Sequence, residues 1–275
     1  MRKDIKTMKI IDAHLHFVQD DPYFNQIAKA AGHINSLEHL QLEYDRLGIA
    51  GGVVMGNRGL EPKRHQYPAW LRYCIGLDGS YLRTHLVRES LDQIEYHLKQ
   101  EQCAGIKLYP GYNPTYVTDQ VYEPVYELAA FYHKTVAIHM GETAGTGALL
   151  KYAHPLTLDE AAVLHPDVRF VMCHFGNPWL ADAAAVLGKN PNVWADLSGL
   201  LEGKVNVSEL LCEKKGYVEL LKTWLSYLDY EKVMFGTDWP LVNLEEYMEF
   251  IFRITPEKHH EDVFWNNAAD LYGFR

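Results

Sequence analysis

Short apolar runs alternate with helix-like segments along almost the whole of this chain. The runs are 9–17, 51–56, 72–79, 104–110, 134–141, 169–176, 192–199 and 232–240. Successive runs begin about 20 to 40 residues apart, which is enough chain for a helical crossover between parallel strands. Eight such units in 275 residues predict a (β/α)8 barrel, a TIM barrel, formed by a single domain over residues 1–275. A doubly wound open sheet would need a Gly-rich phosphate turn after its first strand, and the sequence has none.

The segments between the runs have the apolar spacing of helices. Their apolar side chains recur three and four positions apart. We expect helices within 36–47, 87–100, 124–133, 156–166, 177–189 and 216–228. Residues 17–35, after the first run, form a long connection that could be part of a lid.

Composition and charge exclude several classes of protein. Hydrophobic residues make up 48% of the chain, too many for a disordered one. A formal charge of −10 argues against a nucleic-acid partner, because an acidic surface repels phosphate. No apolar stretch approaches the roughly 18 residues that span a bilayer, so we expect no membrane partner. The basic start lacks the apolar region of a signal peptide, and the four cysteines form no CxxC pair. We therefore expect free thiols and a cytoplasmic location.

Two histidines follow one another at the end of the first apolar run. Functional groups of a (β/α)8 barrel lie at the carboxyl ends of its strands. His14 and His16 are two positions apart, so they share one face of a strand and could bind one metal ion. An HxH pair alone is a weak signal, but its place at a strand end gives it weight.

Three later runs also end in groups that bind metals or carry protons. His139, His174 and Asp238 lie near the ends of the fifth, sixth and eighth runs. A single histidine in an apolar run is usually a hydrogen-bonded core residue, whereas four strand-end histidines with a strand-end aspartate are hard to explain by packing. Imidazole and carboxylate ligands suit Zn²⁺, with Mn²⁺ and Fe²⁺ as alternatives.

Several motifs give the chain a resemblance to a known family. They are IIDAHLHF, GIKLYPGY, VAIHMGET, CHFGNPW, ADLSG, FGTDWP and WNNAADLYGF. With these motifs the sequence resembles the amidohydrolase superfamily of metal-dependent barrels, over essentially its whole length. It is most similar to the amidohydrolase-related branch, which holds TIM-barrel hydrolases and non-oxidative decarboxylases such as aminocarboxymuconate-semialdehyde decarboxylase and γ-resorcylate decarboxylase.

The resemblance implies a role for each strand-end residue. His14, His16, His139 and Asp238 match the ligands of one divalent metal, for which Zn²⁺ is favoured and a second metal is not. His174 matches a histidine that serves as an acid, a base or an orienting group in one-metal members and binds the second ion in two-metal members. Asp238 also matches the aspartate that takes a proton from the attacking water.

Two buried-looking polar residues leave alternatives open. Lys107 shares a strand face with Tyr109, opposite Ile106 and Leu108, and should therefore point into the barrel. It could be a carbamylated bridge between two metals, a partner of the substrate or of a ligand, or a structural residue. Asp12 lies on the same face as His14 and could orient a ligand or fill a polar layer.

Weaker candidates lie in loops at the expected mouth of the barrel. Arg58 could hold an anionic group, and Glu142 could reach the metal or a substrate hydroxyl, although an exposed arginine and a helix-capping acid are the more ordinary interpretations. Tyr109 and Asn177, with Tyr112, Trp179 and Trp239, could form pocket walls.

Three functions from different classes are consistent with these residues. The favoured one is hydrolysis of a small amide, ester or lactone by metal-activated water. The alternative is a lyase: a non-oxidative decarboxylase or hydratase for a small unsaturated or aromatic carboxylic acid. The third is a metal-binding or ligand-binding barrel without activity. The expected partners are a small-molecule substrate and, by the resemblance, further copies of the chain.

Overall fold

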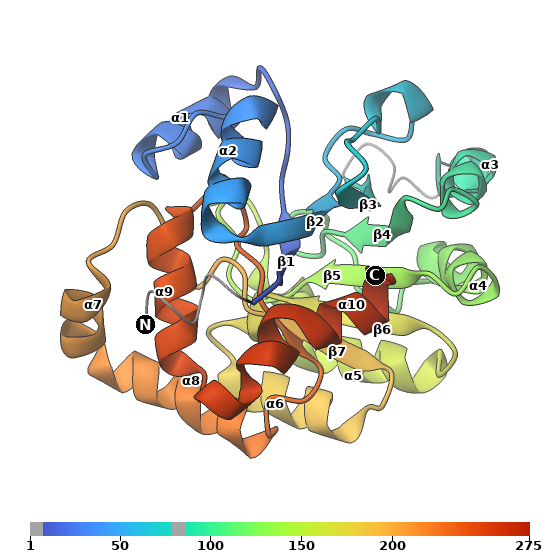
Figure 1. Cartoon of the computed structure of the whole chain (residues 1–275). Helices are drawn as coiled ribbons and strands as arrows, with labels where there is room; N and C mark the ends of the chain where they lie inside the picture. Colours follow the sequence, from blue (N-terminus) through green and yellow to red (C-terminus); the bar gives the residue numbers. More distant parts are fainter. Residues whose placement is uncertain (1–7, 79–85) are drawn as a thin grey trace. The chain divides into compact units, whose positions relative to one another are not determined.

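The computed structural model describes residues 8–78 and 86–275, so Gly79, the last residue of the third apolar run, lies outside the described residues. Eight strands are present there: β1 Ile10–Leu15, β2 Ile49–Met55, β3 Leu71–Leu77, β4 Cys103–Leu108, β5 Thr135–His139, β6 Arg169–Cys173, β7 Val193–Asp196 and β8 Val233–Met234. They follow one another in chain order across one parallel sheet (Figure 1). Each predicted run overlaps one strand, although β2, β3 and β4 begin one or two residues before their runs, and the predicted (β/α)8 TIM-barrel class is confirmed.

Helices separate the strands. They are α1 Pro22–Ala30, α2 Leu37–Leu47, α3 Leu86–Leu98, α4 Glu123–Phe131, α5 Pro155–Leu164, α6 Leu180–Lys189, α7 Val207–Glu213, α8 Lys215–Tyr227, α9 Leu244–Ile254 and α10 Asn267–Tyr272. The six predicted helical segments correspond to α2 to α6 and α8. The predicted long connection 17–35 contains α1, which begins at a capping aspartate, Asp21.

Local sequence explains where α2 begins and ends. The Ser36 side chain accepts a hydrogen bond from the His39 N–H, which satisfies one of the first backbone donors of the helix. Gly48 ends the helix with a φ of 76°, a left-handed conformation that favours glycine. Leu40, Tyr44 and Leu47 are buried on one face, as their three- and four-residue spacing requires.

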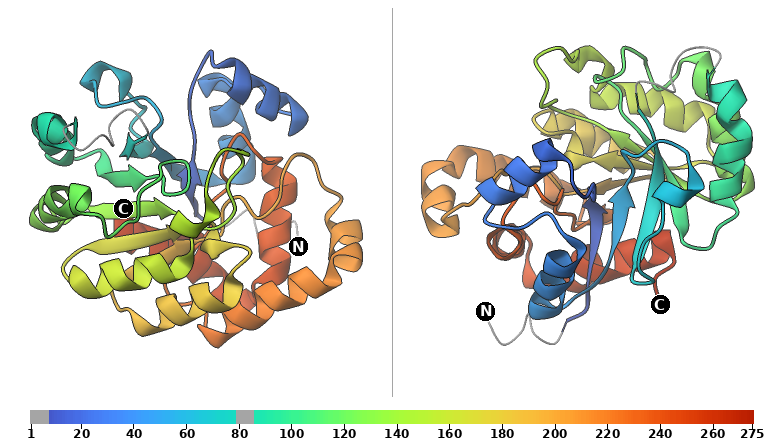
Figure 2. Two further views of the ribbon diagram at one scale, coloured as in Figure 1. Left: turned by 180° about the vertical axis from the view of Figure 1, so that it is seen from behind. Right: turned by 90° about the horizontal axis from the view of Figure 1, so that it is seen from above.

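The contacts of the chain define two compact units, Met1–Val54 with Asp196–Arg275, and Met55–Ala195. In the first unit, β1 pairs with β2, and Ala13 donates its N–H to the Phe235 carbonyl beyond β8. The first and last strands therefore lie side by side. Helix α9 packs beside α8 in this unit (Figure 2).

The last strand is much shorter than the predicted run 232–240. Asp12 accepts hydrogen bonds from both the backbone N–H and the hydroxyl of Thr237, at 2.9 and 2.5 Å. Asp238 then has a φ of 61°, outside the range of a strand. The chain still follows β1, because Asp238 donates its N–H to the His14 carbonyl and His16 donates to the Trp239 carbonyl. A side-chain acceptor therefore replaces part of the regular ladder.

The second unit holds β3 to β6, and β4, β5 and β6 pair in a regular parallel register, whereas the pairing of β3 with β4 shifts between Tyr73 and Cys74. Lys107 of β4 pairs with Ala137 of β5, and Ala137 pairs with Val171 of β6. Gly141, two residues beyond β5, has a φ of 110°, and a Cβ atom there would lie 2.3 Å from the Asn177 carbonyl oxygen. Glycine at this position lets the loops after β5 and β6 approach closely.

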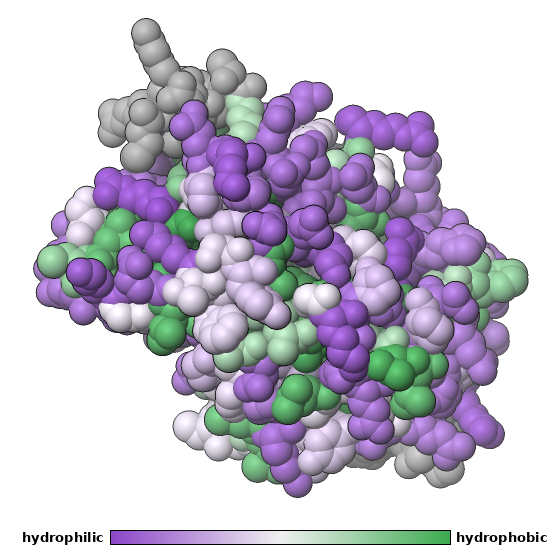
Figure 3. Space-filling model, turned by 90° about the horizontal axis from the view of Figure 1, so that it is seen from below, coloured by the Kyte–Doolittle hydropathy of each residue, from purple (hydrophilic) through white to green (hydrophobic). Residues whose placement is uncertain are grey.

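The helices also bear on the expected absence of a membrane partner. Among residues 8–78 and 86–275, no helix has the length and apolar character needed to cross a membrane. On the face drawn in Figure 3, hydrophobic side chains are scattered among hydrophilic ones.

Candidate metal centre

Three side chains of the first unit converge at the end of β1. His14 Nε2 lies 3.3 Å from Asp238 Oδ1, and His16 Nε2 lies 3.2 Å from the same oxygen. The two imidazole rings are 5.3 Å apart and nearly perpendicular. His14 lies on β1 and His16 just after its end, two residues further on, and the turn after β8 brings Asp238 to both rings. One oxygen of Asp238 therefore lies close to a ring nitrogen of each histidine.

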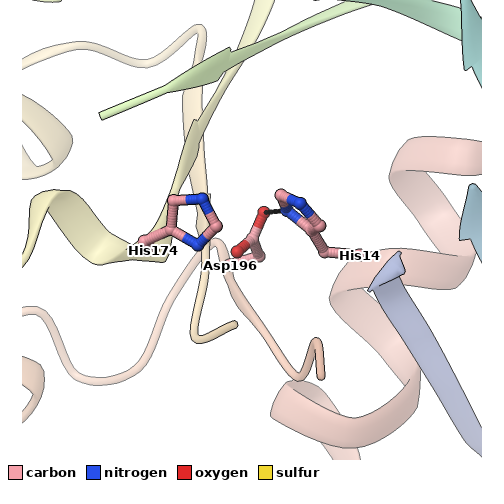
Figure 4. Close-up of side chains that lie close together, drawn as sticks. All are labelled: His14, His174 and Asp196. Atoms are coloured by element: carbon pink, nitrogen blue, oxygen red, sulfur yellow. Dashed lines mark hydrogen bonds and ion pairs between the residues drawn. The ribbon is translucent and has the colours of Figure 1, made fainter. Parts of the chain in front are cut away.

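Asp196, at the end of β7, fixes the His14 ring from the other side. His14 Nδ1 lies 3.0 Å from Asp196 Oδ2, and both side chains are fully buried. Asp196 Oδ1 accepts hydrogen bonds from the hydroxyl and the backbone N–H of Ser198. Figure 4 draws the contact between His14 and Asp196 as a dashed line and also shows His174 of the second unit. Sequence reasoning assigned Asp196 no role, although the ADLSG motif placed an acid at a strand end.

This donor set fits a divalent cation. When His14 donates Nδ1–H to Asp196, its Nε2 carries a lone pair directed at Asp238. The Nε2 atoms of His14 and His16 and an oxygen of Asp238 lie within 4.8 Å of one another. Two imidazoles and one carboxylate are the ligand types of zinc and non-haem iron sites.

Asp12 supports the backbone around this centre. It is fully buried and accepts hydrogen bonds from the Tyr44 hydroxyl, at 2.7 Å, and from the backbone N–H of His14. With its two bonds from Thr237, it ties β1, α2 and the turn after β8 together. Burial raises the pKa of Asp12 to about 6, against the lowering effect of these hydrogen bonds. These contacts of Asp12 are those of a residue in a polar layer.

A second histidine pair lies in the second unit. His174 Nε2 and His139 Nδ1 are 3.1 Å apart, and His139 Nε2 lies 3.0 Å from the Glu142 carbonyl oxygen. Donation of Nε2–H to that carbonyl leaves the lone pair of His139 on Nδ1. The ring of Tyr112 packs edge-on against His139, with centroids 5.0 Å apart. His139 is thus oriented by its own loop.

Two of these side chains are carried by strained backbone. His174 and Asp238 both have a φ of 61°. A left-handed conformation costs a residue with a Cβ atom about 1–2 kcal/mol and persists where the surrounding structure enforces it. Such strain is concentrated at functional sites, which supports a role for both side chains.

The candidate residues that the sequence placed in loops at the barrel mouth differ from one another in exposure and in hydrogen-bond partners. The Glu142 side chain is exposed, and it is the Glu142 backbone that contacts His139. Asn177 accepts the Glu142 N–H through its carbonyl oxygen, and the Tyr109 hydroxyl donates to the Gly56 carbonyl at 2.6 Å. Arg58 donates to the Arg64 carbonyl and lies over the Tyr67 ring.

Lys107 points into the interior, as its position on β4 predicts. Its side chain is 1% exposed. The Nζ atom lies 2.8 Å from Cys173 Sγ and 5.3 Å from the centre of the Tyr109 ring. Within the described part of the chain, no carboxylate forms an ion pair with it.

The family model described as amidohydrolase matches residues 11–274. This chain belongs to the amidohydrolase family. No curated protein matches this amidohydrolase at the threshold of the search. The family match agrees with the resemblance carried by the strand-end motifs.

Solved structures share the fold of this amidohydrolase. An uncharacterised TIM-barrel protein from Bordetella bronchiseptica is 20% identical, with a TM-score of 0.71 over 97% of this chain and 99% of that one. A probable 2-pyrone-4,6-dicarboxylic acid hydrolase from Acinetobacter baumannii, with citric acid bound, is 16% identical, with a TM-score of 0.61 over 97% and 99%. The 5-carboxyvanillate decarboxylase of Novosphingobium aromaticivorans, in complex with manganese, is 11% identical, with a TM-score of 0.67 over 98% and 97%.

Proposed function

We propose that this amidohydrolase is a metal-dependent hydrolase that cleaves a small ester, amide or lactone with water. The observation that carries the proposal is the approach of Asp238 Oδ1 to two imidazole nitrogens, at 3.2 and 3.3 Å. A carboxylate placed there would hold a divalent cation and could also accept a proton from an attacking water. Asp238 would therefore serve both in metal binding and in proton transfer.

His139 is the fourth proposed ligand, through Nδ1. It ends β5, as His14 lies near the end of β1, and the functional groups of this fold gather at the carboxyl ends of the strands. The Glu142 carbonyl occupies its other nitrogen, which is the second hydrogen bond that a metal-binding histidine usually makes. We propose one divalent ion, with Zn²⁺ favoured by the imidazole-rich set.

A divalent cation would supply Lewis acidity, which lowers the pKa of water toward about 7 and polarises a carbonyl. The other steps belong to side chains. The second carboxylate oxygen of Asp238 accepts the proton of the attacking water, and His174 donates a proton to the leaving group. His174 Nε2 lies 3.1 Å from His139 Nδ1, and a cation bound at Nδ1 would replace this contact.

Residues of the second unit are the proposed substrate contacts. The amine of Lys107 and the guanidinium of Arg58 would hold an anionic group, while Tyr109, Asn177 and the loop of Glu142 shape the pocket. Asn177 Oδ1 is buried without a hydrogen-bond partner among the described residues, so it can accept one from a substrate hydroxyl or amide. The proposed substrate is therefore a small molecule that carries a carboxylate.

A lyase is the second candidate. The fold is shared with a manganese-containing 5-carboxyvanillate decarboxylase as well as with a probable 2-pyrone-4,6-dicarboxylic acid hydrolase. In a decarboxylase the same cation would hold the substrate, and Asp238 or His174 would move a proton to carbon.

Product analysis in ¹⁸O-water tests the proposal. The purified protein, loaded in turn with Zn²⁺ and Mn²⁺, is screened against small lactones, esters, amides and aromatic carboxylic acids. Hydrolysis places ¹⁸O in the product acid, whereas CO₂ release without ¹⁸O incorporation would identify the lyase. Elemental analysis with anomalous scattering determines which metal is bound and how many ions there are.

Asp238→Asn separates an enzyme from a metal-binding protein without activity. An enzyme loses turnover with this variant while it keeps most of its metal, and Asp167→Asn, an exposed change, leaves both unaltered. A protein that binds metal tightly and turns over no member of the panel would contradict an enzymatic role. Size-exclusion chromatography with light scattering tests whether the enzyme is a homo-oligomer.

A further inference from the structure

The unusual pair in the second unit is a lysine in contact with a cysteine. Lys107 Nζ lies 2.8 Å from Cys173 Sγ, and both side chains are buried. An N–H···O hydrogen bond spans about 2.9 Å, and sulfur is a larger atom than oxygen. The nitrogen and the sulfur are therefore closer than an ordinary hydrogen bond to sulfur allows. This separation is close to the one that a single bridging oxygen atom would set.

The sheet holds the two residues against one another. Lys107 lies on β4 and Cys173 ends β6, with β5 between them. Lys107 pairs with Ala137, whose small side chain leaves room above β5, while Cys173 pairs with His139. The regular register on both sides of β5 keeps the amine and the thiol in one position. Preorganisation of this kind favours a reaction between them.

The pair also has the chemical character that oxidation needs. Thiols are oxidised at sulfur, and the Cys173 sulfur is in direct contact with the Lys107 amine. Burial raises the pKa of the Cys103 thiol to about 12 and that of Cys74 further still, which keeps both protonated. The Cys103 thiol donates instead to the Gly105 carbonyl, at 3.5 Å.

We propose that Lys107 and Cys173 form an oxidative N–O–S cross-link between β4 and β6, with dioxygen as the oxidant. The amine and the thiol react with one O₂ to give the Nζ–O–Sγ bridge and one water. One N–H bond, the S–H bond and the O–O bond break, and one N–O bond, one O–S bond and the two O–H bonds of water form. Nitrogen and sulfur lose two electrons each, and the four electrons reduce O₂.

The balance of hydrogen and oxygen follows from this stoichiometry. The amine brings two hydrogens and the thiol one. The bridge keeps one of these hydrogens and one oxygen atom, and water takes the other two hydrogens and the second oxygen atom. Reduction by a thiol such as dithiothreitol, with four electrons and protons in all, returns the free amine and the free thiol and releases the bridging oxygen as water.

Peptide mapping of the full-length protein tests the cross-link. The protein is purified in air and, in parallel, without oxygen, then alkylated and digested with trypsin. Trypsin does not cut after a modified lysine, so the bridge joins peptide 100–134 to peptide 170–189. We expect the mass of the pair to exceed the sum of the peptides by one oxygen and to lack two hydrogens. Dithiothreitol should separate the peptides and restore cleavage after Lys107.

Matched variants assign the link to this pair. Cys173→Ser and Lys107→Met should each abolish the joined peptides, whereas Cys74→Ser and Cys212→Ser should retain them. Far-ultraviolet circular dichroism shows whether the two disruptive variants fold. If one does not, the peptide masses of the wild-type protein still decide the question. Separate peptides in air, a pair lacking the additional oxygen, or a link to another cysteine would overturn the proposal.

The bridge would also affect the proposed function. Oxidation removes the amine that we propose for an anionic substrate group and constrains the residue that precedes His174. This consequence rests on the proposed function, so turnover of the oxidised enzyme should fall and recover with dithiothreitol. The peptide masses do not depend on activity, so failure of the proposed function leaves the test of the cross-link intact.

Discussion

His14 Nδ1 lies 3.0 Å from Asp196 Oδ2, with both side chains removed from solvent. This contact determines which nitrogen of His14 faces Asp238. A buried carboxylate that accepts Nδ1–H makes Nε2 the lone-pair nitrogen and increases its basicity. The metal affinity of the candidate centre is therefore expected to depend on Asp196, a residue outside the proposed ligand set.

Replacement of Asp196 by Asn should weaken metal binding. The amide carries no charge and can present an N–H to Nδ1, so His14 loses its preferred tautomer. We expect metal affinity to fall about 10- to 100-fold. Titration of the metal-free protein with Zn²⁺ against a chelating dye measures the dissociation constant, and exposed Asp167→Asn provides the control. An unchanged dissociation constant in a folded Asp196→Asn protein would show that Asp196 does not orient the ligand.

Replacement of Asp238 by Asn should reduce turnover far more than metal content. The amide oxygen can still face the metal, but the side chain no longer accepts a proton. Loss of a general base costs about 10²- to 10⁴-fold in rate. Turnover of whichever substrate the screen identifies is compared with the metal content of the same preparation. Equal losses of metal and turnover would assign Asp238 to metal binding alone.

Removal of the Tyr44 hydroxyl should destabilise the first unit. The hydroxyl donates to Asp12 at 2.7 Å, and both groups are buried. Tyr44→Phe leaves a buried carboxylate with one donor fewer, which costs about 1–3 kcal/mol. The midpoint of urea unfolding should fall with little change of the m-value. Tyr227→Phe, at a side chain that is 67% exposed, is the matched control and should leave the midpoint in place.

His33 should make the folded state sensitive to mild acid. Its pKa is lowered to about 4, mainly by burial and then by the adjacent His39. The unfolded chain, with a histidine pKa near about 6.5, therefore binds more protons between these values. The contribution of His33 to stability is thus complete above about pH 6.5 and is lost as the pH falls toward 4.

His33→Gln isolates this effect. We expect the free energy of unfolding of the wild type to fall more than that of the variant between pH 7 and pH 4.5, by on the order of 1–2 kcal/mol. His133→Asn, at an exposed histidine, should retain the wild-type dependence. Parallel curves for the wild type and His33→Gln would contradict a lowered pKa at His33.

Regular features of the fold could be predicted because they are repeated locally. The apolar runs and the spacing between them predicted each strand, and the two-residue period of β1 predicted that His14 and His16 share a face. The turn after β8 could not be predicted, because Asp12 interrupts the strand from a position 225 residues away in the chain.

The partners of the polar residues also lie far away in the chain. Asp196 contacts His14 across 182 residues, and Lys107 contacts Cys173 across 66. Strand periodicity predicted that Lys107 points inward, but it does not indicate which side chain lies next to the Lys107 amine. The joining of His139 to the ligand set remains a prediction.

The amino-acid sequence alone determined the order of strands and helices, the family and the identity of the strand-end side chains, because these depend on local periodicity and short motifs. Tertiary structure alone decided that Asp196 orients His14, that Asp12 shapes the turn beside Asp238, and that a thiol faces Lys107. The physical reason is that hydrogen bonds between side chains require atoms within about 3 Å, and only packing of distant segments creates that proximity.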